Sequence, residues 1–85
     1  MARVEIYVKG FCSYCYRAEK LLESKGAEFK AYTLDSPERR QEMIARANVR
    51  TTVPQIFIDG HHVGGCDDLY ALDREGKLEQ LLKAA

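Results

Sequence analysis

The sequence predicts an α/β fold in which a four-stranded mixed sheet is flanked by about three helices. Two observations carry this prediction. Strand-like and helix-like patterns alternate through the first half of the chain, and a two-residue turn near residue 59 joins two short apolar runs. Strands that alternate with helices pair in parallel through right-handed crossovers. We therefore expect the first two strands to be parallel and the hairpin to lie antiparallel beside them.

Length and composition indicate a single domain over residues 1–85. Hydrophobic residues make up 46% of the chain and charged residues 31%, which is ordinary globular composition. The 13 Lys and Arg residues balance the 13 Asp and Glu residues, and the basic residues are spread along the chain. This balance gives no electrostatic reason to expect nucleic acid or an anionic membrane as a partner.

The expected compartment is the cytoplasm. The stretch "MARVEIYV" moves directly into a strand pattern without the features of a secretory signal, and no apolar run is long enough to span a bilayer. Three cysteines, two of which share one C-x-x-C motif, are poor material for a secreted disulfide scaffold. A reducing cytosol fits this usage better.

The first strand and the first helix are indicated by periodicity. Segment 3–8 is rich in β-branched residues, with Val4, Ile6 and Val8 on one face and Glu5 and Tyr7 on the other. The next apolar residues have the three-and-four spacing of one helix face. These residues are Ala18, Leu21 and Leu22. Lys25 and Gly26 are typical of a helix end, so the C-x-x-C lies where a strand passes into a helix.

The remaining elements follow from caps and turns. Segment 28–34 alternates like a second strand, and Asp35 or Ser36 can cap a helix that has Pro37 in its first turn. Met43, Ile44 and Ala47 form the apolar face of that helix. Asp59–Gly60 predicts a hairpin between runs 55–58 and 62–63. The last segment is leucine-rich and helical, with a break near Gly76.

The C-x-x-C motif "FCSYC" predicts a redox couple. At a helix start, unpaired N–H groups and the positive end of the helix dipole favour a thiolate, so we expect Cys12 to be the nucleophile. Cys15 lies one turn further on, where a shielded but close thiol can resolve a mixed disulfide on Cys12. Lys9 adds positive charge nearby, and Phe11 and Tyr14 flank the sulfur with apolar surface.

Two structural interpretations compete with the redox couple. Cys12, Cys15 and Cys66 with one histidine could supply four zinc ligands, but the adjacent residues His61 and His62 point to opposite faces of a strand and the spacing is not that of a zinc finger. A static disulfide would be reduced in the cytosol and would cross-link almost no chain. We therefore expect no metal site.

Four stretches of this sequence resemble the glutaredoxin family, and the likeness covers nearly the whole chain. They are "KGFCSYC" at 9–15, "TVPQIFI" at 52–58, "GGCDDL" at 64–69, and the strand and helix order between them. The chain is most similar to the short bacterial dithiol class, in which a third cysteine follows the double glycine as Cys66 does here. The resemblance implies a thioredoxin-like fold with glutathione as the cofactor, docked beside the nucleophile.

The resemblance also implies a set of binding residues for glutathione. Pro54 would be preceded by a cis bond that exposes the backbone of Val53 for antiparallel pairing with the tripeptide. The backbone N–H groups of Cys66 and Asp67 would bind the γ-glutamyl carboxylate, and the Asp67 side chain would face the ammonium group. Gly64 and Gly65 would permit the close approach.

The far end of glutathione and the walls of its groove would be formed by four further side chains. Lys9 and Gln41, or Arg40 beside it, would bind the glycine carboxylate, while Tyr14 and Thr52 would line the groove. Taken residue by residue, plainer interpretations stay open. Pro54 also suits a strand start, Asp67 and Asp68 also complement a helix dipole, and exposed polar residues also suit a solvated surface.

The function that this resemblance implies is glutathione-dependent thiol–disulfide exchange on glutathionylated or disulfide-containing proteins, a part of cellular electron transport and redox homeostasis. A monomer is expected. One departure keeps an alternative open: many dithiol glutaredoxins carry proline where this chain has Ser13, and a less rigid motif occurs in some that hold a 2Fe–2S cluster between two subunits. Ser13 also adds an N–H that could donate toward the Cys12 sulfur. Cys66 stays unassigned between a buried apolar residue, a regulatory thiol and a backbone donor.

Overall fold

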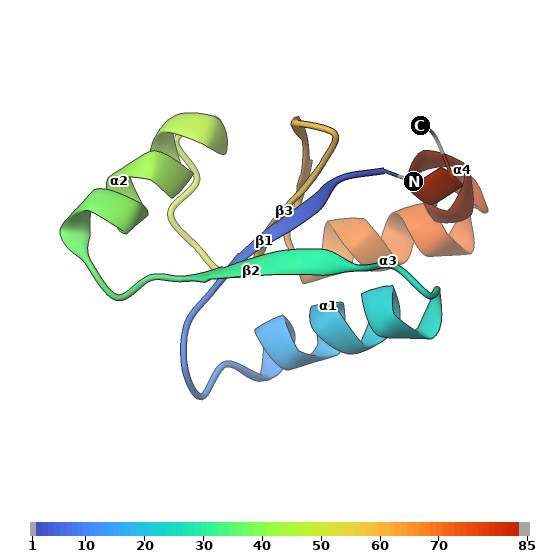
Figure 1. The fold of residues 1–85 in the computed structure, drawn as a ribbon, viewed down its shortest axis with the longest axis horizontal. Coiled ribbons are helices and arrows are strands. Elements are labelled where there is room, and N and C mark those ends of the chain that lie inside the picture. Colours follow the sequence, from blue (N-terminus) through green and yellow to red (C-terminus); the bar gives the residue numbers. More distant parts are fainter. Residues whose placement is uncertain (1, 84–85) are drawn as a thin grey trace.

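The fold is a four-stranded sheet with helices on both faces, as Figure 1 shows. A computed structural model describes residues 2–83. Its elements are β1 (Val4–Val8), α1 (Ser13–Ser24), β2 (Phe29–Thr33), α2 (Pro37–Arg46), β3 (Gln55–Ile58), β4 (His61–Gly64), α3 (Cys66–Arg74) and α4 (Lys77–Lys83). The expected element order is confirmed, and the leucine-rich end divides into α3 and α4 because Gly76 turns the chain with φ +73°.

The sheet has the order β2-β1-β3-β4. β1 pairs with β2 in parallel and with β3 antiparallel, and β3 pairs antiparallel with β4. The parallel pair and the antiparallel hairpin are those that the sequence predicts. β4 extends one residue beyond the predicted run at each end, because the backbone continues to pair after the apolar side chains stop.

Helix ends follow the capping chemistry of the sequence. Ser36 caps α2, since its Oγ accepts a hydrogen bond from the Arg39 N–H at 3.1 Å. α1 ends at Lys25 and Gly26, where Gly26 adopts φ +73°. Cys12 occupies the cap position of α1, so the sequence locates its first cysteine at the helix start correctly.

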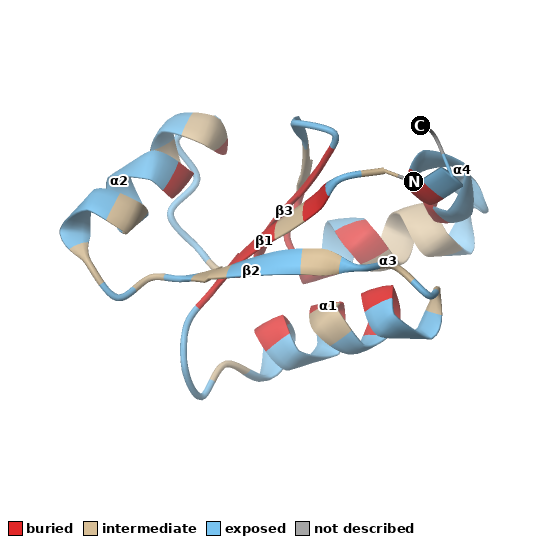
Figure 2. Ribbon diagram, in the orientation of Figure 1, coloured by how far each residue is buried: buried red, intermediate tan, exposed pale blue. Residues whose placement is uncertain are grey.

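The larger core lies between the sheet and the helices α1, α3 and α4. It contains thirteen buried residues: Val4, Ile6, Val8, Cys15, Ala18, Leu21, Leu22, Ile56, Ile58, Cys66, Leu69, Leu78 and Leu82. Figure 2 shows the buried faces of α1 and α3 and the buried centre of the sheet. This core fixes the start of α1, and therefore Cys12, relative to β1 and β3.

The opposite face of the sheet is covered by α2. Its core has only four buried residues, which are Tyr7, Met43, Ala47 and Phe57. Tyr7 shares the face of Glu5, as strand alternation predicts, but it is fully buried under α2. β1 is thus packed on both faces, as is typical of a central strand with helices on either side.

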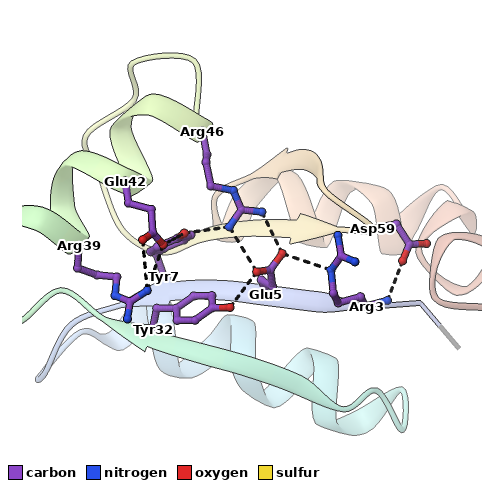
Figure 3. A network of polar contacts seen from close by, with 8 residues as sticks. All are labelled: Arg3, Glu5, Tyr7, Tyr32, Arg39, Glu42, Arg46 and Asp59. Atoms are coloured by element: carbon purple, nitrogen blue, oxygen red, sulfur yellow. Dashed lines mark hydrogen bonds and ion pairs between the residues drawn. The ribbon is translucent and has the colours of Figure 1, made fainter.

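A polar network borders this smaller core and ties α2 to β1 and β2 (Figure 3). Arg46 Nη2 lies 2.9 Å from Glu5 Oε1, and Arg46 Nη1 donates to the Tyr7 hydroxyl at 2.9 Å. The Tyr7 hydroxyl in turn donates to Glu42, and the Tyr32 hydroxyl donates to Glu5 at 2.9 Å. The network fixes the position of α2 on the sheet.

Within residues 2–83, no helix combines the length and the apolar composition that crossing a bilayer requires.

Candidate active site

The Cys12 sulfur caps the first turn of α1. Its Sγ accepts a hydrogen bond from the Cys15 backbone N–H at 3.2 Å. The sequence suggests Ser13 as the donor toward this sulfur, and here the structure differs. A cap side chain reaches the N–H three residues on, whereas Ser13 occupies the first helical position and is exposed. The Cys12 sulfur therefore lies at the positive end of the α1 dipole and accepts one of the free N–H groups of the first turn.

The other two cysteines are buried thiols. Burial, with the neighbouring Cys12 sulfur, raises the pKa of Cys15 to about 12. Burial also raises the pKa of Cys66. All three cysteines are free, and Cys12 is the one that is partly exposed. The C-x-x-C pair is therefore asymmetric: Cys12 is partly exposed to solvent, and Cys15 is a buried thiol whose pKa is raised.

The loop between β1 and α1 presents Phe11 to solvent. Phe11 has φ +56°, a left-handed conformation that is unusual for a bulky residue, and its side chain is fully exposed. Lys9 at the start of this loop is also exposed. Both residues line the surface next to Cys12, as the sequence predicts for them.

Two adjoining hollows share Tyr14, Thr52 and Val53, and Cys12 lines the larger of them. The smaller has a volume of about 160 Å³ and extends toward the start of α3. The larger has a volume of about 490 Å³ and extends toward the start of α1 and toward α2.

The smaller hollow is lined by Tyr14, Arg50, Thr52, Val53, Pro54, Gly65, Cys66, Asp67 and Asp68. The larger is lined by Lys9, Phe11, Cys12, Ser13, Tyr14, Leu34, Arg40, Thr51, Thr52 and Val53. Together they form one groove that passes Cys12, which we call the Val53 groove.

The Val53–Pro54 peptide bond is cis, as the family resemblance predicts. Val53 is half-buried and Pro54 is buried, so the bond forms the floor of the Val53 groove.

The start of α3 forms the far end of the groove. Asp68 accepts a hydrogen bond from the Gly65 N–H at 2.9 Å, and this bond lowers the pKa of Asp68 with help from Arg50, whose Nη1 lies 3.1 Å from Oδ2. Gly64 has φ +119°, and a Cβ there would clash with the Asp68 carboxylate. Asp68 is therefore occupied in shaping the turn, whereas Asp67 is exposed at the groove.

Most of the residues expected at the site line this groove. They are Lys9, Cys12, Tyr14, Thr52, Val53, Pro54, Gly65, Cys66 and Asp67. Gln41 is exposed on α2 and lines neither hollow, whereas Arg40 lines the larger one. Arg50 is a groove residue that sequence reasoning missed, because it lies in an irregular segment with no periodic pattern to place it.

Over residues 2–83, no three His, Cys, Asp or Glu side chains are grouped so that they could hold a metal ion.

Comparisons with known proteins agree with this geometry. A family model described as Glutaredoxin matches residues 4–63. The chain is 60% identical over 84 residues to "Glutaredoxin 3" of Escherichia coli strain K12, which covers 98% of this chain and 100% of that protein.

Solved structures give the same result. The solution structure of a glutaredoxin from Brucella melitensis is 56% identical with a TM-score of 0.85, over 98% of this chain and 90% of that one. A crystal structure of a buckwheat glutaredoxin–glutathione complex is 32% identical with a TM-score of 0.84, over 95% of this chain and 76% of that one. The fold of this chain is thus similar to solved glutaredoxins over nearly its whole length.

Proposed function

The chain belongs to the glutaredoxin family of thiol–disulfide oxidoreductases, and from this we propose that glutathione is its cosubstrate and Cys12 its nucleophile. The observation that carries the proposal is the Val53 groove, which passes the one partly exposed thiol. Similarity to a glutaredoxin solved as a glutathione complex supports it. Because the thiol pair works only while it is kept reduced, we place the reaction in the cytoplasm.

The groove offers complementary groups to an extended tripeptide of about 10 Å. In our proposal the Val53 backbone pairs with glutathione as an added strand would. The N–H groups at the start of α3 bind the γ-glutamyl carboxylate, with Asp67 facing its ammonium group. Lys9 and Arg40, or Gln41 after a side-chain movement, bind the glycine carboxylate at the other end.

Deglutathionylation then takes two exchanges. The Cys12 thiolate attacks the glutathione sulfur of a protein–glutathione mixed disulfide, a new S–S bond forms on Cys12, and the protein thiolate leaves and takes a proton from water. A glutathione thiolate next attacks the glutathione sulfur on Cys12. Glutathione disulfide leaves and the Cys12 thiolate is restored.

Protein disulfides require Cys15 as well. After Cys12 has formed a mixed disulfide with the substrate, Cys15 gives up its proton and attacks the Cys12 sulfur. The reduced substrate leaves and a Cys12–Cys15 disulfide remains, which glutathione reduces. Burial is the main cause of the raised Cys15 pKa, and the Cys12 sulfur adds to it. Conversion of Cys12 to a neutral disulfide removes the second contribution and so makes the Cys15 proton easier to lose.

Two single substitutions test this proposal. Cys12→Ser abolishes turnover of a glutathionylated peptide with glutathione, and Cys15→Ser retains that turnover but loses reduction of protein disulfides. Intact mass of Cys15→Ser after brief exposure to glutathione disulfide shows one glutathionyl adduct, which Cys12→Ser/Cys15→Ser lacks. Full activity of Cys12→Ser contradicts the proposal.

Anaerobic reconstitution separates catalysis from the alternative of a 2Fe–2S carrier. That alternative predicts a brown, glutathione-dependent dimer after anaerobic reconstitution, with its visible absorption lost in Cys12→Ser. A colourless monomer that turns over glutathionylated peptide supports the oxidoreductase.

A further inference from the structure

Gln55 carries a fully buried amide side chain, and its contacts lead to the Val53 groove. Its Nε2 donates to the Thr52 carbonyl oxygen at 3.0 Å and to the Thr52 hydroxyl at 3.2 Å. Its Oε1 lies 2.6 Å from Nε2 of His62. Because a carbonyl oxygen only accepts, the amide nitrogen of Gln55 must face Thr52 and its oxygen must face His62.

This orientation fixes the proton on His62. Since Oε1 of Gln55 only accepts, Nε2 of His62 carries a hydrogen and donates it. Nδ1 then lies 3.4 Å from Asn48 Nδ2 as an acceptor. The ring also packs against Phe57 with centroids 5.1 Å apart. Burial and the nearby Arg50 lower the pKa of His62, opposed by Asp68, so the neutral ring is favoured.

We propose that His62 and Gln55 are positioning residues that hold Thr52 and Val53 in place for glutathione, a role that rests on the proposed function. Thr52 and Val53 line both hollows, so they lie where the two ends of the groove meet. Thr52 is exposed and precedes the sheet, and the hydrogen bonds from Gln55 tie its backbone to β3. His62 on β4 holds the Gln55 amide in turn.

The arrangement is unusual for a structural residue. An apolar side chain could fill the buried Gln55 position without needing partners, whereas a buried amide is unfavourable unless it is fully hydrogen-bonded. Every buried polar side-chain atom of residues 2–83 has a partner. The amide therefore fixes the conformation of the Thr52 backbone as well as filling space.

Three substitutions test the positioning role through steady-state kinetics with a glutathionylated peptide. Gln55→Met keeps the volume and removes the amide, and His62→Phe keeps the packing on Phe57 and removes the donor. We expect both to raise KM, by about tenfold for Gln55→Met, since one buried hydrogen bond corresponds to roughly that factor, with little change in kcat. His62→Gln restores a donor at the Nε2 position and keeps KM near that of the unsubstituted protein.

Two controls separate positioning from general loosening. Ile58→Val lies on the same strand and removes one buried methylene, and it leaves KM unchanged. The alkylation rate of Cys12 by iodoacetamide, which needs no groove, stays the same in all variants. ¹⁵N NMR of the unsubstituted protein shows the His62 proton on Nε2.

Unchanged KM in folded His62→Phe, an equal rise in Ile58→Val, or a proton on Nδ1 would overturn the inference. The KM of Gln55→Met is interpreted only if its circular dichroism spectrum is native. If Gln55→Met does not fold, the KM of His62→Phe decides the question, because His62 is only half-buried and its substitution perturbs folding less. Failure of the proposed function looks different, because the unsubstituted protein then shows no glutathione-dependent turnover.

Discussion

The two faces of the sheet are covered by different kinds of side-chain contact. The face under α1, α3 and α4 has a continuous apolar core of thirteen residues. The face under α2 has four buried residues, and charged and hydroxyl groups complete the contact. Arg46 contacts both the apolar and the polar residues under α2. Its guanidinium lies 4.2 Å from the Phe57 ring centroid and also pairs with Glu5.

The difference shows how the two halves of the site are positioned. The apolar face holds α1 and α3, which carry Cys12 and the far end of the groove, by packing that is not directional. The polar face holds α2 by hydrogen bonds that fix its rotation and its shift along the sheet. Because Arg40 lies on α2, its distance from Cys12 depends on the polar face.

The largest expected effect comes from breaking the apolar face. Leu22→Ala removes a fully buried side chain, so we expect the free energy of unfolding to fall by about 2–5 kcal/mol. Guanidinium unfolding followed by circular dichroism measures the change. Leu81→Ala is the matched control, since Leu81 is exposed on α4, and it changes stability by about 0.5 kcal/mol or less. Equal losses for the two variants would refute the assignment of this core.

Breaking the polar face has a smaller effect. Arg46→Met keeps the apolar stem but leaves Glu5 and the Tyr7 hydroxyl short of a partner, so we expect a loss of about 1–3 kcal/mol in the same unfolding assay. Arg74→Met, on an exposed position at the end of α3, serves as the control. An Arg46→Met protein as stable as its control would show that the network contributes nothing.

The smallest effect is the pH dependence that the polar face contributes to stability. Hydrogen bonding to Arg46 lowers the pKa of Glu5 below its usual 4.5, with burial opposing. The charged pair therefore stabilises the fold above that pH and loses its contribution as pH falls through the lower folded-state value. We expect Glu5→Gln to be less stable than the unsubstituted protein at pH 7, by roughly 1 kcal/mol or less, and the gap to narrow toward pH 3.

Unfolding at several pH values measures this gap. The loss in Leu22→Ala should not change over the same range, because no charge is involved. A Glu5→Gln gap that widens on acidification would contradict the sign.

The sequence predicts the apolar face better than the polar one. Alternation in segment 3–8 and the spacing of Ala18, Leu21 and Leu22 identify the buried faces of β1 and α1, because burial leaves a periodic trace. Nothing comparable marks the network, since Glu5, Tyr32 and Arg46 come from three elements and meet only after the sheet has formed.

The candidate site also has features that the sequence predicts and features that it does not. Local rules place Cys12 at a helix start, and the family resemblance supplies the cis bond before Pro54. The contacts of Gln55 with Thr52 and His62, and the place of Arg50 in the groove, depend on how the irregular segment after α2 meets β3 and β4. Side-chain hydrogen bonds of this kind have no sequence period from which to predict them.

The packing of α1 on α3 has a consequence for how the protein is made. Cys15 is shielded by a cluster that includes Cys66 and Leu69, more than fifty residues later in the chain. Synthesis proceeds from the amino terminus, so both thiols of the motif leave the ribosome well before that shield exists. During this interval Cys15 lacks the burial that it has in the folded protein. The difference in exposure between the two thiols is complete only when the last third of the chain has been translated and folded.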